Sequence, residues 1–237
     1  MTRIKIKNLP TDINSNQDML EYFDNSYRRL KAQGRHGSCS QKRIAVFKEF
    51  IETVLRGGDV PKEGKILELG CGAGTTIIWL ARKGFDVYGV DISGAAITMA
   101  RARVKESGLE ADLRVGNALD LKDYRDDFFD LVLDGRCFHF IHGEDRKLFL
   151  ASVCRVLKPS GILVVVSRCT EIALNKRSGK DSYAFHRDQW EKETSHYLGR
   201  PQDIRDEIIG AGFSILDWRV SGSEKEGCDL LVKSQKP

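Results

Sequence analysis

Three glycines stand at alternate positions in the stretch Leu67-Glu68-Leu69-Gly70-Cys71-Gly72-Ala73-Gly74, between a short apolar run and a helix-like segment. Glycine permits tight turns and a close approach of the backbone to a ligand, so the stretch predicts a strand, a ligand-binding turn and a helix. The dinucleotide fingerprint spaces its glycines G-x-G-x-x-G, and counted from Gly70 its last position here is Thr75. The spacing therefore points away from NAD and toward another nucleoside ligand.

The chain beyond this loop alternates between strand-like and helix-like segments. Seven strands are predicted at Lys65–Leu69, Asp86–Val90, Asp112–Val115, Phe129–Leu133, Gly161–Ser167, Phe213–Val220 and Cys228–Lys233. Four helices are predicted at Thr75–Lys83, Ser93–Glu106, Glu144–Leu157 and Gln202–Ile209. Continuous apolar strands separated by helices indicate a doubly wound α/β fold with a mostly parallel sheet. The join Ser221–Gly227 is too short for a helical crossover, so the closing pair of strands should be antiparallel.

Two segments lie outside this alternation. Residues 1–60 are expected to form an N-terminal helical cap or lid, with a loosely ordered start over 1–15. Residues 61–237 then form the main domain, and the two parts make effectively one domain. Residues 169–200 are polar and aromatic, and we expect a partly helical insertion that acts as a substrate lid over the carboxyl edge of the sheet.

Composition sets limits on the partners. The 237 residues are enough for one well-buried core, and a net charge of +4 from 38 basic and 34 acidic residues gives little reason to propose nucleic acid. A local basic cluster is expected to be a solvated helix face. Its members are Arg28, Arg29, Lys31, Arg35, Lys42 and Arg43.

Cysteine usage and apolar runs indicate a cytoplasmic protein. The six cysteines are scattered and form no C-x-x-C pair, which is typical of reduced thiols. The first seven residues lack the apolar core of a signal peptide. The longest purely apolar run, Ile162–Val166, is far too short to span a membrane.

Polar residues follow the next two strands. Asp91 ends the second strand, where its carboxylate could accept hydrogen bonds from both hydroxyls of a ribose. Ser93 can cap the following helix in its place, which leaves Asp91 free for a ligand. Asn117 ends the third strand, where its amide could contact an adenine edge. Ligands of open α/β sheets bind at this carboxyl edge.

These motifs together resemble the class I, seven-stranded S-adenosylmethionine-dependent methyltransferases. The segments that carry the resemblance are Leu67–Gly74, Val90–Ser93, Gly116–Leu121 and Leu157–Leu163. Two departures are Asn117, where the family more often has aspartate, and Ser160, where it has glycine. The resemblance implies S-adenosylmethionine as methyl donor and S-adenosylhomocysteine as product. It also implies a cofactor site, which would comprise Glu68, Gly70, Cys71, Gly72, Gly74, Asp91, Ile92, Asn117, Ala118 and Asp134.

The end of the fourth strand, Asp134-Gly135-Arg136-Cys137-Phe138-His139, resembles the D-x-G-C-x-H segment of small-molecule methyltransferases, with the glycine and the arginine exchanged. Asp134 and His139 are the candidate catalytic residues. Histidine ordinarily titrates near neutrality, so His139 could remove a proton from an acceptor hydroxyl, thiol or amine. A histidine satisfied by backbone groups is the other interpretation, since methyl transfer can rely on alignment alone.

The sequence thus predicts methyl transfer to O, N or S of a small molecule. No metal is expected, because the spacing of Asp134, Cys137, His139, His142 and Cys169 matches no established ligand pattern. The chain lacks the Asn-Pro-Pro-Tyr and Pro-Cys segments of base methylation. Methylation of RNA or protein, a nucleotide-dependent oxidoreductase and a donor-binding module without catalysis remain alternatives. The acceptor and the oligomeric state stay open.

Overall fold

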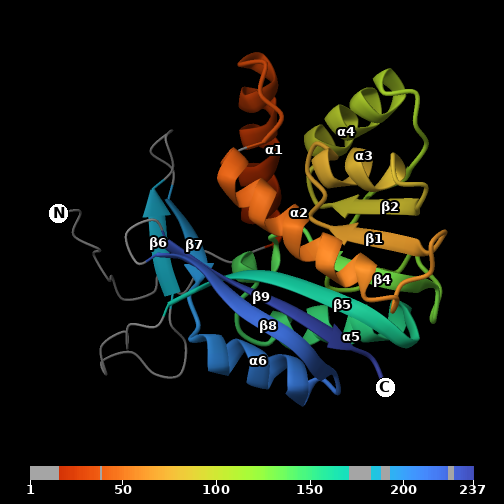
Figure 1. Ribbon diagram of the computed structural model, residues 1–237. Coiled ribbons are helices and arrows are strands. Elements are labelled where there is room, and N and C mark those ends of the chain that lie inside the picture. Colours follow the sequence, from red (N-terminus) through yellow and green to blue (C-terminus); the bar gives the residue numbers. More distant parts are fainter. Residues whose placement is uncertain (1–15, 38, 171–182, 188–192, 224–226) are drawn as a thin grey trace.

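The computed structural model describes residues 16–37, 39–170, 183–187, 193–223 and 227–237. Seven strands form one sheet in the order β3-β2-β1-β4-β5-β9-β8 (Figure 1). Their bounds are β1 Lys65–Leu69, β2 Asp86–Asp91, β3 Asp112–Val115, β4 Phe129–Asp134, β5 Leu157–Cys169, β8 Ser214–Ser223 and β9 Gly227–Gln235. Strands β3, β2, β1, β4 and β5 pair in parallel, and β9 runs antiparallel to both of its neighbours. The predicted mostly parallel sheet with an antiparallel closing strand is confirmed.

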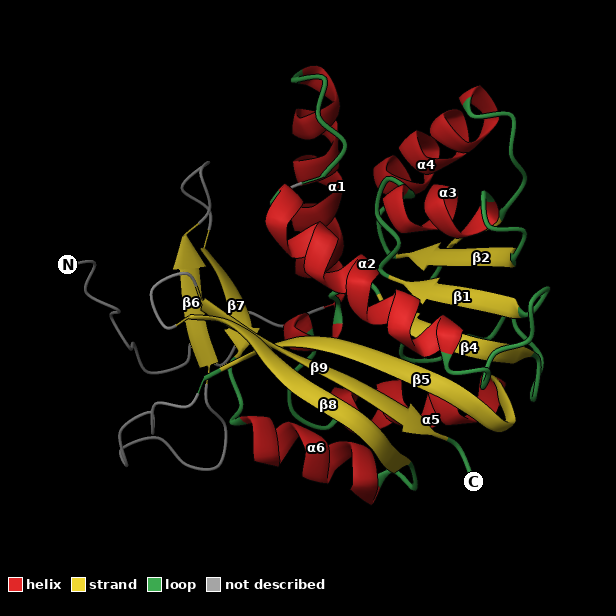
Figure 2. Cartoon of the chain, in the orientation of Figure 1, coloured by secondary structure: helices red, strands yellow, loops and turns green. Residues whose placement is uncertain are grey.

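Helices cover both faces of the sheet (Figure 2). Their bounds are α1 Asn16–Ala32, α2 Gln41–Arg56, α3 Thr75–Ala81, α4 Gly94–Glu106, α5 Asp145–Val156 and α6 Pro201–Gly210. Apolar residues of α2, α3 and α4 form one core cluster with one face of the sheet, and those of α5 and α6 form another with the opposite face. Successive residues Val164 and Val165 of β5 belong to different clusters and are both fully buried. Alternate side chains of a strand point to opposite faces, so a run without polar residues fits a sheet buried on both sides.

Helix α2 belongs to the core, whereas α1 stands over the carboxyl ends of the first strands (Figure 1). Phe47, Phe50, Ile51 and Val54 of α2 are buried. Helix α1 has one buried apolar residue among those whose side chains are described, Leu30. The segment expected to form a helical cap thus contains two helices, and the two occupy different positions.

The insertion after β5 differs from the expectation where it is described. We predicted a partly helical segment, and its described residues form two antiparallel strands instead, β6 (Tyr183–Arg187) and β7 (Glu193–Tyr197). Both are short and contain the aromatic residues that favour strands. The hairpin lies at the end of the sheet toward which β1 and β2 point (Figure 1). The remaining positions of 169–200, like the start over 1–15, lie largely or wholly outside the described residues.

Candidate functional site

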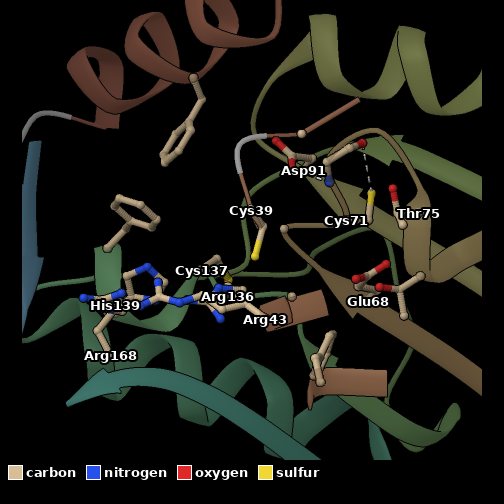
Figure 3. A pocket seen from close by; sticks show the side chains of 18 of the residues that line it. Cys39, Arg43, Glu68, Cys71, Thr75, Asp91, Arg136, Cys137, His139 and Arg168 are labelled. Carbon is tan, nitrogen blue, oxygen red and sulfur yellow. Dashed lines mark hydrogen bonds between the residues drawn. The ribbon is translucent and has the colours of Figure 1, made fainter. Parts of the chain in front are cut away.

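A cavity of about 1300 Å³ opens at the carboxyl ends of the central strands. The loops after β1, β2, β3 and β4 line it, and α1, the start of α2 and the ends of β5, β8 and β9 close its other sides. In Figure 3 the acidic and glycine-loop residues gather on one side, and His139 with three arginines gathers on the other. The cavity therefore has two chemically different walls.

The glycine loop shapes the first wall. Gly72 has φ +53°, and a Cβ at this position would overlap the hydroxyl of Tyr27, which reaches over the loop from α1. Gly70 has φ +66°, and its Cβ would lie 2.9 Å from Cβ of Cys137. These two positions therefore require glycine for both conformation and space.

Gly74 was predicted to bind the cofactor, and the structure places it against α4. It lies outside the cavity lining, and its backbone approaches Ala100, whose Cβ would be 3.2 Å from a Cβ on Gly74. Its φ of +74° ends the turn just before α3. Gly74 thus allows α3 to pack closely on α4, and it contributes nothing to the cavity surface.

Asp91 joins the ends of β1 and β2. Its two carboxylate oxygens accept hydrogen bonds from N–H of Gly72 (2.9 Å) and N–H of Ser93 (2.9 Å). Ser93 caps α4 by accepting a bond from N–H of Ala96, so Asp91 is not the helix cap. Asp91 lines the cavity although only 8% of it is exposed. Burial raises the pKa of Asp91 to about 6, and the two backbone donors oppose that rise.

Glu68 is a second buried carboxyl group in the same wall. Burial raises its pKa to about 8, against the lowering effect of a hydrogen bond with Thr76. Its Oε2 has no hydrogen-bond partner among the described residues. A buried acceptor without a partner is costly in an apolar surrounding, which makes Glu68 a candidate to meet a ligand donor.

The remaining predicted cofactor residues also line the cavity, namely Cys71, Ile92, Asn117 and Ala118. Asn117 stabilises its own turn, because its side-chain oxygen accepts a bond from N–H of Leu119 (3.0 Å). Its amide therefore takes a fixed orientation at the end of β3.

Helix α1 is held over the cavity by Asp24. One oxygen of Asp24 accepts bonds from the hydroxyl of Ser93 (2.9 Å) and from N–H of Ala95 (2.8 Å) at the start of α4. On the other wall, Phe23 of α1 meets Phe140 edge to face, with ring centroids 5.0 Å apart. No sequence pattern indicated that an aspartate in α1 anchors this helix.

Asp134 lies beneath the cavity surface. It is fully buried and accepts three backbone bonds, from N–H of Cys137 (2.7 Å), Phe138 (3.1 Å) and Val166 (3.3 Å). Burial raises its pKa in spite of these donors. Asp134 does not line the cavity, so the geometry gives no support to its predicted contact with cofactor or substrate. It fixes the start of the loop that carries His139.

His139 lies in a short 3-10 helix, Phe138–Phe140, and lines the cavity. The buried guanidinium of Arg146 holds this segment by donating to the carbonyls of Phe138 (2.8 Å) and Ile141 (3.1 Å). The same guanidinium pairs with Glu207 of α6 at 2.7 Å. Arg146 therefore holds the segment that carries His139 in a fixed position, as a residue acting as a general acid or base requires.

Three arginines form the rest of the second wall, and sequence reasoning missed them as a group. Arg43, Arg136 and Arg168 surround the carboxylate of Asp229. Arg43 was expected on a solvated helix face, but it turns into the cavity because α2 begins at its edge. The signal in the sequence was the arginine that replaces a motif glycine at position 136.

No group of three or more His, Cys, Asp or Glu side chains within the described ranges is arranged to hold a metal ion. All six cysteines are free thiols. No helix in the described part of the chain is long and apolar enough to cross a membrane.

The sheet order and the cavity at its carboxyl edge define a doubly wound α/β protein with its ligand site at the strand ends. Residues 67–165 match a family described as a methyltransferase domain. The ubiquinone biosynthesis O-methyltransferase of Maricaulis maris is 31% identical over 198 residues, covering 76% of this chain and 75% of that protein. This chain belongs to the class I S-adenosylmethionine-dependent methyltransferases.

Other relatives match over shorter parts. The ribosomal RNA small subunit methyltransferase C of Alcanivorax borkumensis is 30% identical over 139 residues, which cover 55% of this chain and 40% of that protein. The chain spans less than half the length of this relative and of one from Haemophilus influenzae.

The 1,6-didemethyltoxoflavin-N1-methyltransferase of Burkholderia thailandensis, whose structure contains S-adenosylhomocysteine, aligns with a TM-score of 0.72 at 14% identity. The alignment covers 96% of this chain and 93% of that one. At this identity the likeness shows the fold alone.

Proposed function

We propose that this protein transfers a methyl group from S-adenosylmethionine to an oxygen, nitrogen or sulfur atom of a small molecule. One observation carries the proposal. The backbone N–H of Gly72 donates a hydrogen bond to the carboxylate of Asp91, and both residues line a cavity of about 1300 Å³. Pockets for a single drug-sized ligand usually measure about 300–1000 Å³. This cavity has room for a nucleoside donor together with an acceptor.

The first wall suits the donor. Gly72 has no side chain and would meet the ligand once Tyr27 of α1 moves aside, Asp91 offers acceptors for ribose hydroxyls, and Asn117 offers a fixed amide for an adenine edge. The unpartnered oxygen of Glu68 would accept from the ammonium group of the methionine part, whose positive charge would lower the pKa of Glu68 from about 8 and favour its ionised form. When bound, the donor would supply an electrophilic sulfonium methyl group, to which the acceptor O, N or S atom would bond as the carbon–sulfur bond breaks and S-adenosylhomocysteine leaves.

Two measurements, one of donor binding and one of methyl transfer, test the proposal directly. Purified protein should bind S-adenosylhomocysteine in calorimetry and should transfer a labelled methyl group to a small molecule of a cell extract, which mass spectrometry then identifies. Binding of NAD but not of the donor would replace the proposal with an oxidoreductase. Donor binding without transfer to any acceptor would indicate a binding module.

Donor affinity should fall as the pH drops through 6. The ionised form of Asp91 is the better acceptor for ribose hydroxyls, and protonation competes with binding once the pH is below the pKa of about 6. Calorimetry with S-adenosylhomocysteine should give a dissociation constant about tenfold weaker at pH 5 than at pH 7.

Asp91→Asn provides the control for this prediction. The amide cannot titrate, so the variant should bind more weakly at pH 7 by roughly 1–3 kcal/mol and should lose the dependence on pH between 5 and 7. An unchanged pH dependence in this variant would assign the titration to another group.

His139 is proposed to take a proton from an acceptor hydroxyl or thiol. His139→Gln should then lower methyl transfer by about a hundredfold, because a general base typically contributes at least this factor. The affinity for S-adenosylhomocysteine should stay unchanged. Glu110→Gln, a substitution at an exposed position outside the cavity, is the control and should keep full activity. Equal activity of both variants would leave alignment as the source of catalysis.

Helix α1 and the insertion over 169–200 are proposed to close over the bound donor. The support is the position of α1, which Asp24 ties to the start of α4 and whose Tyr27 reaches Gly72. Closure of such segments excludes water and shapes a small-molecule site.

A steep dependence of RNA binding on salt would favour a nucleic-acid acceptor in place of a small molecule.

A further inference from the structure

We propose that the methyl acceptor carries an oxyanion, such as a carboxylate or a phosphate, which binds the three arginines Arg43, Arg136 and Arg168. The inference rests on the proposed methyl transfer and names the chemical class of its acceptor. Carboxylate and phosphate groups share the feature that matters here, a negative charge delocalised over two or three oxygen atoms.

Four separate segments bring these charges to one place. Arg136 follows β4 and makes a bidentate pair with Asp229 of β9, with N–O distances of 3.0 and 3.1 Å. Arg43 comes from the first turn of α2 and lies 3.7 Å from the same carboxylate. Arg168 is the neighbour of Asp229 across β5 and β9 in register, at 4.0 Å.

Three guanidinium charges therefore surround the single carboxylate of Asp229. Asp229 is 7% exposed, so little water screens the group. Nε of Arg168 is buried and makes no hydrogen bond within the described part of the chain. Burial lowers the pKa of Arg168, and repulsion from Arg43 lowers it further. An added anion would offset both effects.

The backbone conformation of Arg136 supports a ligand-binding role for the arginine cluster. Arg136 has φ +73°, a left-handed conformation that side-chain-bearing residues rarely adopt. The resembled motif has glycine at this position. Strain of about 1–3 kcal/mol at such a residue persists only where surrounding contacts enforce it, and it is concentrated at ligand sites. Here the strain places a guanidinium in the cavity wall.

The position of the cluster suits an acceptor. All four charged residues line the same cavity as His139 and the glycine loop. In Figure 3, Arg43, Arg136 and Arg168 lie on the side of His139 and away from Asp91 and Thr75. Aromatic rings from α1 and from the 3-10 helix line the cavity near by, among them Phe23 and Phe140. An acceptor with an apolar ring and an anionic end matches this wall.

Calorimetry on the full chain saturated with S-adenosylhomocysteine tests the proposal with 3-phenylpropanoate, its neutral analogue 3-phenylpropanamide, and phenyl phosphate. An oxyanion probe should bind at least about tenfold more tightly than the amide, the difference expected for a charge-assisted hydrogen bond. The phosphate arm distinguishes a tetrahedral from a planar anion.

Arg168→Gln should remove most of this preference while the amide and S-adenosylhomocysteine bind as before, and Arg168→Lys should retain part of it. Arg125→Gln is the matched control, because it removes the same charge from an exposed position outside the cavity. Equal or undetectable binding of all probes, or an unchanged preference in Arg168→Gln, would overturn the proposal and leave the arginines as a clamp on Asp229. Failure to bind S-adenosylhomocysteine would instead count against the proposed methyl transfer.

Discussion

Gly72→Val is expected to abolish detectable donor binding, with a loss of about a hundredfold or more in affinity, or roughly 3 kcal/mol. Gly72 has φ +53° and its Cβ would overlap the hydroxyl of Tyr27. A β-branched residue strains this backbone and also covers the surface that the donor would contact. Calorimetric titration with S-adenosylhomocysteine measures the loss, and circular dichroism reports whether the fold is kept.

Gly84→Val separates the two causes. Gly84 has φ +88°, but no atom lies within 4 Å of its Cβ position, and the residue is exposed in the turn after α3. This variant introduces backbone strain without touching the cavity, so it should lower stability and leave donor affinity unchanged. If Gly72→Val bound the donor as well as Gly84→Val did, the loop would be only a turn.

Asp134→Ala should destabilise the protein by about 3 kcal/mol or more. The change leaves three backbone N–H groups, those of Cys137, Phe138 and Val166, buried without an acceptor. Each unsatisfied buried donor costs about 1–3 kcal/mol, and the three are close enough for their effects to overlap. Urea denaturation monitored by fluorescence gives the free energy of unfolding.

Two further variants define the role of Asp134. Asp134→Asn keeps one acceptor oxygen and should lose less stability than alanine does. Asp86→Ala removes an exposed aspartate whose ion pair with Lys65 spans 2.6 Å at the surface, and it should cost under about 1 kcal/mol. Equal stability of Asp134→Ala and Asp86→Ala would contradict the structural role of Asp134.

The regular elements could be predicted because their signals are local. The boundaries of β1 and β3 match the prediction, those of β2 and α4 differ from it by one residue at one end, and those of α5 differ by one residue at each end. Strand β5 begins at Leu157, four residues before the predicted start at Gly161. The intervening turn contains Ser160 with φ +61°, where the resembled motif has glycine. Ser160 thus adopts the left-handed backbone conformation that glycine favours.

The residues of the first wall could be predicted for the same reason. Its residues follow strands whose carboxyl ends meet at one edge, so Asp91 and Asn117 could be placed together from strand positions alone. Gly74 and Asp134 were predicted as site residues but are not among the residues that line the cavity, because strand position does not reveal whether a residue faces a cavity or the core. Gly74 faces α4, and Asp134 faces three backbone donors beneath the surface.

The sequence by itself determined the doubly wound sheet, the glycine loop and the positions of Asp91 and Asn117 at the strand ends, since periodicity and spacing act over short stretches of chain. Only the tertiary structure showed that the three arginines and Asp229 form the second wall of the cavity. Arg43, Arg136, Arg168 and Asp229 come from four segments, and Arg43 and Asp229 are separated by most of the chain. No local pattern links such residues, because their proximity depends on how α2 and β9 pack beside the strand ends. Burial there turns scattered charges into one site by removing the water that would otherwise screen them.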